Sequence, residues 1–167
     1  MTIRHAGPDD LPRVVAIYNA SIPGRLATAD TAPVTVAERQ GWFRDFDPVR
    51  RPLWVHCDAG DEPMAWLSLR SFYGRPAYVA TVEVGVYTAP EALRQGRGAA
   101  LLAHAIEAMP SLQIKTLLAF IFAHNEPSRR LFERAGFVRW GLLPRVAELD
   151  GIERDVMILG FREPEAE

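Results

Sequence analysis

A short segment near the middle of the chain combines a carboxylate with a turn that can bind an anion. Residues 81–88 are rich in β-branched and aromatic side chains, which predicts a strand with Glu83 near its centre. Residues 95–100 (Gln-Gly-Arg-Gly-Ala-Ala) precede an apolar stripe at helical spacing within residues 101–109. The small residues leave backbone N–H groups uncovered at a helix N-terminus, where the helix dipole is positive. Strand, amide turn and helix together predict a phosphate-binding element.

Two better-known phosphate motifs do not fit this turn. A P-loop needs a lysine and then serine or threonine after its last glycine, but Ala99 and Ala100 follow Gly98. The dinucleotide fingerprint needs a third glycine, and position 101 is Leu101. The spacing that does fit is Gln/Arg-x-x-Gly-x-Gly/Ala, in which Gln95 takes the first position.

The composition excludes several classes of function. The 167 residues are 49% hydrophobic and 24% charged, as in a soluble globular domain, and the formal net charge is -2. There is no basic run for nucleic acid or a membrane surface, and no apolar stretch of the ~20 residues that a membrane span needs. The single cysteine, Cys57, cannot form an internal disulfide or a cysteine-rich metal site. We therefore expect a cytoplasmic protein without a metal.

The apolar patterns predict one α+β domain over residues 1–167, with helices packed on a mostly antiparallel sheet. Strands are predicted at 2–6, 53–57, 64–69, 81–88, 117–122, 137–149 and 152–161, and helices from Leu11, Thr35, Leu101 and Asn125. The run 117–122 is continuously apolar, so we expect burial on both faces. Residues 70–76 are predicted as a loop, and the long connection 19–34 is expected to be functional or mobile.

Local signals fix several boundaries. Thr35 and Glu38 have the spacing of a capping box, which predicts a helix start. Asn125 is a good N-cap, with Pro127 in the first helical turn. Asp150-Gly151 between two strand-like runs is the strongest hairpin signal in the chain.

The order of elements and the motifs together resemble the GCN5-related N-acetyltransferase (GNAT) superfamily over essentially the whole chain. The resemblance implies the GNAT fold, with about seven strands and four flanking helices. More narrowly, the chain resembles the branch of phosphinothricin and methionine sulfoximine N-acetyltransferases. The stretches that carry this resemblance are Thr2–Arg4, Ile17–Asn19, Arg70–Gly74, Thr81–Glu83, Val86–Tyr87, the turn at 95–100, Asn125–Leu131 and Ala135–Phe137.

The resemblance implies acetyl transfer from acetyl-CoA, as co-substrate, to the primary amine of a small amino-acid-like substrate. By the same likeness, acetyl-CoA would be bound by Val86, Tyr87, Thr88, Gln95, Gly96, Arg97, Gly98, Ala99, Ala100, Leu101 and Asn125. The amine would be bound by Arg70, Ser71, Phe72, Tyr73, Glu83, Val84 and Gly85. The branch commonly forms homodimers, for which the aromatic-rich C-terminal hairpin could supply an interface.

Acetyl transfer needs a neutral amine, a stabilised oxyanion and a proton for the departing thiolate. Glu83 can take the ammonium proton directly or through a water, and backbone N–H groups near Val86 and Tyr87 can bind the oxyanion. Phe132 stands where close relatives carry histidine or tyrosine, so a water, Tyr87 or another hydroxyl must donate the proton, if any group does. A covalent acyl-enzyme is not expected, because Cys57 lies within an apolar strand.

Other interpretations remain open at this point. Glu83 could be a solvated strand residue, and Arg70 either an ordinary loop charge or a clamp for a substrate carboxylate. The chain could instead acetylate a protein N-terminus or lysine, or be a non-catalytic acyl-CoA sensor that retained the turn and lost its acid.

Overall fold

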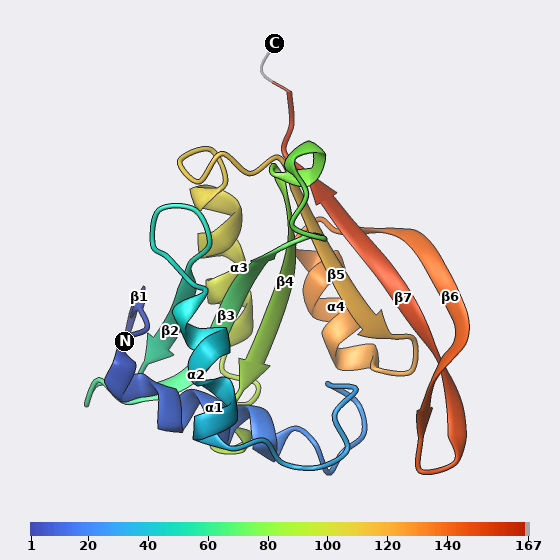
Figure 1. The fold of residues 1–167 in the computed structure, drawn as a ribbon, viewed down its shortest axis with the longest axis horizontal. Helices are drawn as coiled ribbons and strands as arrows, with labels where there is room; N and C mark the ends of the chain where they lie inside the picture. The colour runs from blue at the N-terminus through green and yellow to red at the C-terminus, as the bar shows by residue number, and fades with distance from the viewer. Residues whose placement is uncertain (166–167) are drawn as a thin grey trace.

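The computed structural model describes residues 1–165, which form a twisted seven-stranded sheet with helices on both faces (Figure 1). The strands are β1 (Thr2–His5), β2 (Leu53–Cys57), β3 (Pro63–Ser71), β4 (Thr81–Thr88), β5 (Thr116–Phe122), β6 (Val138–Leu149) and β7 (Ile152–Arg162). The helices are α1 (Leu11–Ala20), α2 (Val36–Arg44), α3 (Arg97–Ala108) and α4 (Glu126–Arg134). The strand order is β1-β2-β3-β4-β5-β7-β6, in which β4 and β5 pair in parallel and the other neighbours are antiparallel. The predicted fold class is confirmed.

The two faces of the sheet carry separate hydrophobic cores. One core joins α3 and α4 to the sheet, and the other joins α1 and α2 to it. Successive side chains of a strand point to opposite faces, so Val82 and Val84 of β4 enter the α3 core. Glu83 and Tyr87 therefore face the side of α1. The strand pattern thus places the carboxylate predicted to be catalytic on the face opposite α3.

The local signals are borne out. Thr35 Oγ1 accepts from Glu38 N at 3.1 Å, and the Glu38 carboxylate reaches back to Thr35 N, which is the predicted capping box. Asn125 Oδ1 accepts from Ser128 N at 3.3 Å and caps α4. The β6–β7 turn has positive φ at both Asp150 and Gly151, as a two-residue hairpin of this type requires.

Two predictions about the strands were wrong in detail. Residues 117–122 were expected to be buried on both faces of the sheet, but Phe120 is 37% exposed. Its face of β5 borders a cavity rather than a helix. The predicted loop 70–76 begins two residues too early, because Arg70 and Ser71 pair with Glu83 and Val82 as part of β3. The loop instead follows β3, at Phe72.

Strands β4 and β5 are neighbours for only part of their length. Their parallel pairing runs from Thr81 opposite Thr116 to Glu83 opposite Leu118, and beyond these residues the strands diverge (Figure 1). Antiparallel pairing with β3 continues on the other side of β4 as far as Thr88. The second half of β4 therefore turns one edge of backbone groups toward the gap between β4 and β5.

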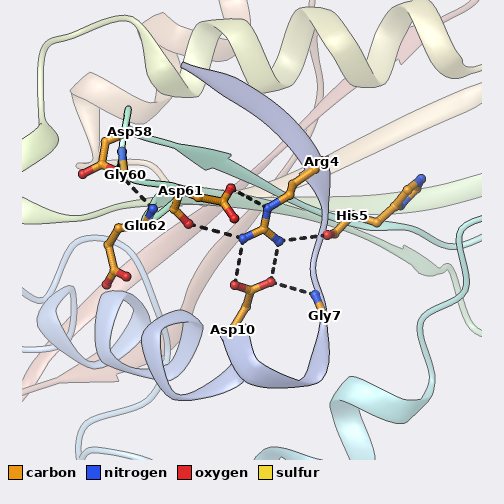
Figure 2. A network of polar contacts seen from close by, with 8 residues as sticks. All are labelled: Arg4, His5, Gly7, Asp10, Asp58, Gly60, Asp61 and Glu62. Carbon is orange, nitrogen blue, oxygen red and sulfur yellow. Dashed lines mark hydrogen bonds and ion pairs between the residues drawn. The ribbon is translucent and has the colours of Figure 1, made fainter.

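A network of ion pairs ties the N-terminal strand to the rest of the domain (Figure 2). The Arg4 guanidinium donates to both carboxylate oxygens of Asp10, at 2.7 and 3.0 Å, and to Asp61 Oδ1 at 2.9 Å. Asp10 also accepts from Gly7 N at 2.7 Å. The bond from Arg4, with help from Gly7, holds the pKa of Asp10 below its ordinary value. Arg4 thus joins β1 to the start of α1 and to the β2–β3 turn.

We expect Asp10→Asn to lower the free energy of unfolding by about 1–3 kcal/mol at neutral pH, because a bidentate charged contact is lost. A carboxyl whose folded pKa is depressed stabilises the fold above its unfolded pKa of about 3.9, and that stabilisation is lost as pH falls through the folded pKa. The difference in free energy of unfolding between wild type and Asp10→Asn should therefore shrink as the pH is lowered. Urea unfolding across pH tests this, with the neighbouring exposed Asp9→Asn as control; an equal loss in both variants would contradict it.

Candidate active site

A cavity of about 280 Å³ lies where β4 and β5 diverge. Its walls come from β4, β5, α4 with its N-cap, and the connection between α1 and α2, with one residue from β7. The lining residues are Leu26, Ala27, Thr28, Ala29, Glu83, Val84, Gly85, Val86, Tyr87, Phe120, Ile121, Phe122, Asn125, Ser128, Phe132 and Val156. The structure thus brings together Glu83–Tyr87 and Asn125, which were predicted from distant parts of the sequence.

Glu83 contributes an acidic side chain to the wall of this cavity, and part of that side chain remains exposed to solvent. Partial removal from water raises the pKa of its carboxyl above the ordinary value, and the positive charge of Arg70 offsets part of that rise. Arg70 is the cross-strand neighbour of Glu83 in the β3–β4 register. A carboxylate with a raised pKa is a stronger base, so this environment suits proton abstraction.

We expect Arg70→Gln to move the acidic limb of the kcat/KM profile to higher pH. Loss of the guanidinium leaves burial unopposed, so the pKa of Glu83 rises further and the base is protonated over a wider range. A pH profile of kcat/KM for the amine measures this, with Arg75→Gln in the following loop as the matched control. An acidic limb that stays in place would show that Arg70 does not act on Glu83.

The predicted phosphate turn begins α3 beside the cavity. Gly96 is the N-cap, with φ +75, and a Cβ added there would meet no atom within 4 Å. The N–H groups of the first helical turn have no partner within the helix, so they are available to an anion at this open end. Leu101 is fully buried in the α3 core, so only the backbone in this part of the turn can face a ligand.

The Arg97 side chain points into the protein. It is 7% exposed, and its Nη1 lies 3.0 Å from Nδ1 of His56 on β2, itself 8% exposed. A guanidinium can only donate, so Nδ1 accepts and the imidazole is neutral in this arrangement. Burial, and then the charge of Arg97, lower the pKa of His56, which favours the same state. Arg97 can therefore offer an anion its backbone N–H but not its charged group in this rotamer.

The side chains packed around Gly98 leave little room for a side chain at this position. A Cβ added there would lie 3.3 Å from Leu131 Cδ2 and 3.6 Å from Val86 Cγ1. These contacts join α3 to α4 and to β4 at the edge of the cavity. A bulky residue at this position would separate the elements, so it would disturb the fold as well as the turn.

The connection between α1 and α2 crosses the cavity as a strap, which we define as residues 25–30. Figure 1 shows this segment running from the end of α1 toward α4. Asn125 Nδ2 donates to Leu26 O at 3.0 Å, and His124 Nε2 lies 3.0 Å from Arg25 O. Asn125 thus uses its amide to cap α4 and to hold the strap.

Two further contacts fasten the strap. The Tyr87 hydroxyl donates to Ala27 O at 3.3 Å, and Arg25 forms an ion pair with Asp150 at the tip of the β6–β7 hairpin, at 3.0 Å. Burial, with the nearby Tyr18 hydroxyl, raises the pKa of Tyr87 well above its ordinary value. Tyr87 is therefore neutral at physiological pH and remains a donor.

Sequence reasoning did not single out the strap or Phe120, and it placed Ser128 only in the motif that begins α4, not in the site. The signal that could have found the strap was the length of connection 19–34, which was expected to be functional or mobile. Its hydrogen bonds with Tyr87 of β4 and with the connection between β5 and α4 now show it as a wall of the cavity. Phe120 lay within a run that favoured complete burial.

Other predicted residues lie apart from this lining. Within residues 1–165, the cavity wall does not include 70–73, Thr88 or 95–101. Phe72 and Tyr73 instead form an aromatic group with Tyr78, with ring centroids of the first two 4.2 Å apart. Arg70 is connected to the cavity through Glu83, its cross-strand partner in the β3–β4 register.

Phe132 and Cys57, which were considered for roles in catalysis, are both buried. Phe132 is 3% exposed and packs edge-on against Phe137, so α4 presents an apolar ring at this point of the cavity. Cys57 is fully buried on β2, and burial raises the pKa of its thiol. The cysteine is thus in the wrong place and protonation state for a nucleophile.

No group of three or more histidine, cysteine, aspartate or glutamate residues in the described part of the chain is arranged to hold a metal ion. Among residues 1–165, no helix is both long and apolar enough to cross a membrane.

A known family shares this arrangement. The profile described as "Acetyltransferase (GNAT) family" matches residues 14–137, which is most of the chain. The chain therefore belongs to the GNAT family of acetyltransferases. The family match covers β4, the turn at α3 and the start of α4, the elements that build the site.

Among individual proteins, the chain is 48% identical to "Putative phosphinothricin acetyltransferase YwnH" of Bacillus subtilis, over 96% of this chain and 98% of that protein. It is 32% identical to the L-methionine sulfoximine/L-methionine sulfone acetyltransferase of Pseudomonas aeruginosa, over 90% and 87% of the two chains. A solved phosphinothricin acetyltransferase from Sinorhizobium meliloti, in complex with AcCoA, superposes with a TM-score of 0.90 at 27% identity, over 96% and 87%. The suspected branch of the family is thus confirmed.

Proposed function

We propose that this single-domain chain is an acetyl-CoA-dependent N-acetyltransferase. Its acceptor is the primary amine of a small amino-acid-like molecule, of the phosphinothricin or methionine sulfoximine and sulfone type. The named activities of the relatives from Bacillus subtilis and Pseudomonas aeruginosa support this substrate class. The AcCoA complex of the Sinorhizobium meliloti protein supports the acyl donor.

The observation that carries the proposal is the position of Glu83 in the gap between β4 and β5. The cavity there holds about 280 Å³, which suits a small amine beside a thioester better than a protein segment. Glu83, with its raised pKa, takes a proton from the amine, which then attacks the thioester carbonyl directly. Backbone groups of β4 beyond Glu83 turn toward the same gap and provide donors for the oxyanion.

We assign acetyl-CoA to the edge of β4 from Val86 to Thr88, to the N-terminal turn of α3 over residues 95–101, and to Asn125. The open space at Gly96 supports the placement of the pyrophosphate. Asn125 would contribute beside its two existing bonds, since an amide oxygen has a second lone pair. We assign the amine to Glu83–Gly85, with Arg70–Tyr73 on the approach to it.

We further propose a homodimer and a cytoplasmic location. Strand β6 is the last in the sheet order, and large apolar side chains are exposed along the β6–β7 hairpin. They are Val138, Trp140, Leu142, Leu143, Val146 and Ile152. An apolar group of this kind beside an edge strand favours a second copy of the chain. The single cysteine suits a reducing compartment. Sedimentation of the purified protein tests the dimer.

The function is tested by measuring CoA release from acetyl-CoA with methionine sulfone, methionine sulfoximine, phosphinothricin and ordinary amino acids. We expect saturable turnover with at least one of the first three, at a KM within the usual range of about 1 μM to 1 mM. Turnover with peptides alone would favour a protein acetyltransferase. Tight acetyl-CoA binding with no turnover on any acceptor would favour the sensor.

A further inference from the structure

A chain of hydroxyl groups leads from the cavity wall to solvent on the side of α1. Thr28 of the strap lines the cavity, and its Oγ1 lies 2.5 Å from the Tyr18 hydroxyl oxygen. The Tyr18 hydroxyl donates in turn to Asp30 Oδ2. Thr28 and Tyr18 are 9% and 8% exposed, whereas the Asp30 side chain is 45% exposed. Two shielded hydroxyls thus connect the cavity to a carboxylate in contact with water.

The carboxylate of Asp30, at the outer end of the chain, fixes the direction of these hydrogen bonds. An ionised carboxylate can only accept, so Tyr18 gives its single proton to Asp30. Thr28 must then donate to the Tyr18 oxygen. Thr28 Oγ1 already accepts from Asp30 N at 3.2 Å, which leaves one lone pair for a proton from the cavity. Each hydroxyl therefore donates outward, the order in which protons can pass to the carboxylate.

The charged and titratable groups around this hydroxyl chain come from α2 and β4. Arg39 of α2 lies 3.4 Å from Asp30 Oδ2, and its guanidinium carbon is 4.8 Å from the centroid of the Tyr18 ring. The Tyr87 ring of β4 is 5.1 Å from that of Tyr18. Burial raises the pKa of Tyr18, so its hydroxyl keeps its proton at neutral pH and can relay only by passing one on while receiving another.

The proposed reaction releases a proton that such a route can carry, and the inference rests on that proposed function. An ammonium nitrogen carries three protons and the product amide carries one, so two protons leave the nitrogen in each turnover. One returns to the departing sulfur to give the thiol, and the other must reach solvent. Glu83 borders the cavity and is exposed to solvent, so it can carry one of these protons, and the hydroxyl chain that begins at Thr28 provides a separate route from the cavity wall.

We propose that Thr28, Tyr18 and Asp30 form a proton-exit relay for the acetyl transfer. A proton from the substrate nitrogen, or from a water bound to it, bonds to Thr28 Oγ1 as the Thr28 proton passes to Tyr18. The Tyr18 proton passes to Asp30 at the same time, and Asp30 releases it to solvent. Both hydroxyls then rotate back to their starting positions. No bond to carbon changes in the relay, and no other reactant is needed.

The test compares variants that keep shape and lose a relay proton. Tyr18→Phe retains the ring that packs beside Tyr87, and Thr28→Val retains the volume of threonine. We expect each to lower kcat with the preferred amine by about 10-fold or more, with little change in KM for acetyl-CoA. Thr28→Ser should recover most of the rate lost in Thr28→Val, because it restores the hydroxyl. Asp45→Asn, an exposed carboxylate after α2, is the control.

A proton inventory in mixtures of H₂O and D₂O separates a relay from a structural effect. For the wild type we expect a curved dependence of kcat on deuterium content, because several protons move together. Tyr18→Phe and Thr28→Val should make it linear. An unchanged rate, or a reduced rate with an unchanged inventory and pH profile, would overturn the relay and leave the proposed function intact. Absence of any amine-dependent CoA release from the wild type would overturn both.

Discussion

Replacing Glu83 with glutamine is expected to lower kcat by about 10²- to 10³-fold, the range for loss of a general base. Glutamine keeps the size and polarity of the side chain but cannot take a proton from the amine. Because Glu83 lies in the cavity and outside the turn at α3, the KM for acetyl-CoA should change little. Steady-state CoA release at several pH values measures both constants.

The pH dependence gives a second check on the same residue. The raised pKa of Glu83 shifts the acidic limb of the wild-type kcat/KM profile to higher pH than an ordinary glutamate would give, and this limb should disappear in Glu83→Gln. Glu83→Asp, which keeps an acid on a shorter stem, is the matched control and should retain the limb at a reduced rate. A Glu83→Gln variant with wild-type kcat would remove this residue as the base.

Ala99→Glu is expected to weaken acetyl-CoA binding by roughly 10- to 100-fold while leaving the fold intact. Ala99 is exposed in the first turn of α3, and its side chain is free of the packing that constrains Gly98. A carboxylate there occupies the positive end of the helix dipole and repels the pyrophosphate of CoA. The same charge stabilises the isolated helix by about 0.3–1 kcal/mol, so the melting temperature should hold or rise.

Ala99→Glu is expected to weaken acetyl-CoA binding without destabilising the fold, so its effect on binding can be separated from an effect on stability. Ala99→Gln has nearly the same size without charge, so it should bind acetyl-CoA close to normally. Acetyl-pantetheine, which lacks the pyrophosphate, should react equally with Ala99→Glu and wild type. A loss of binding shared by both variants, or by both acyl donors, would contradict the assignment of the phosphates to α3.

Much of the fold was accessible from local sequence signals. The Thr35 capping box, the Asn125 cap and the Asp150-Gly151 turn each act within four residues, and each is present as predicted. The strand 81–88 and the helix over 101–109 were also predicted, because their side-chain periods match a sheet and a helix, although α3 begins four residues earlier, at Arg97. These signals were sufficient to predict the strand that carries Glu83 and the helix that follows it in the chain.

The walls of the cavity could not be predicted in this way. The strap is held by bonds from His124 and Asn125 that join residues 99 positions apart, and no local pattern encodes such a contact. Phe120 has the sequence character of a core residue, and only the divergence of β4 from β5 leaves its face beside a cavity. The inward rotamer of Arg97 depends likewise on His56, which belongs to a distant strand.

The most direct test of the account is a single turnover with acetyl-labelled acetyl-CoA and a methionine sulfone or sulfoximine acceptor. Mass spectrometry would then follow both the amine and the intact protein. Direct attack predicts one labelled acetyl group on the amine nitrogen, formed at the rate of CoA release, with no labelled protein at any time. Label that appears first on the protein, or CoA release without an acetylated amine, would contradict the account.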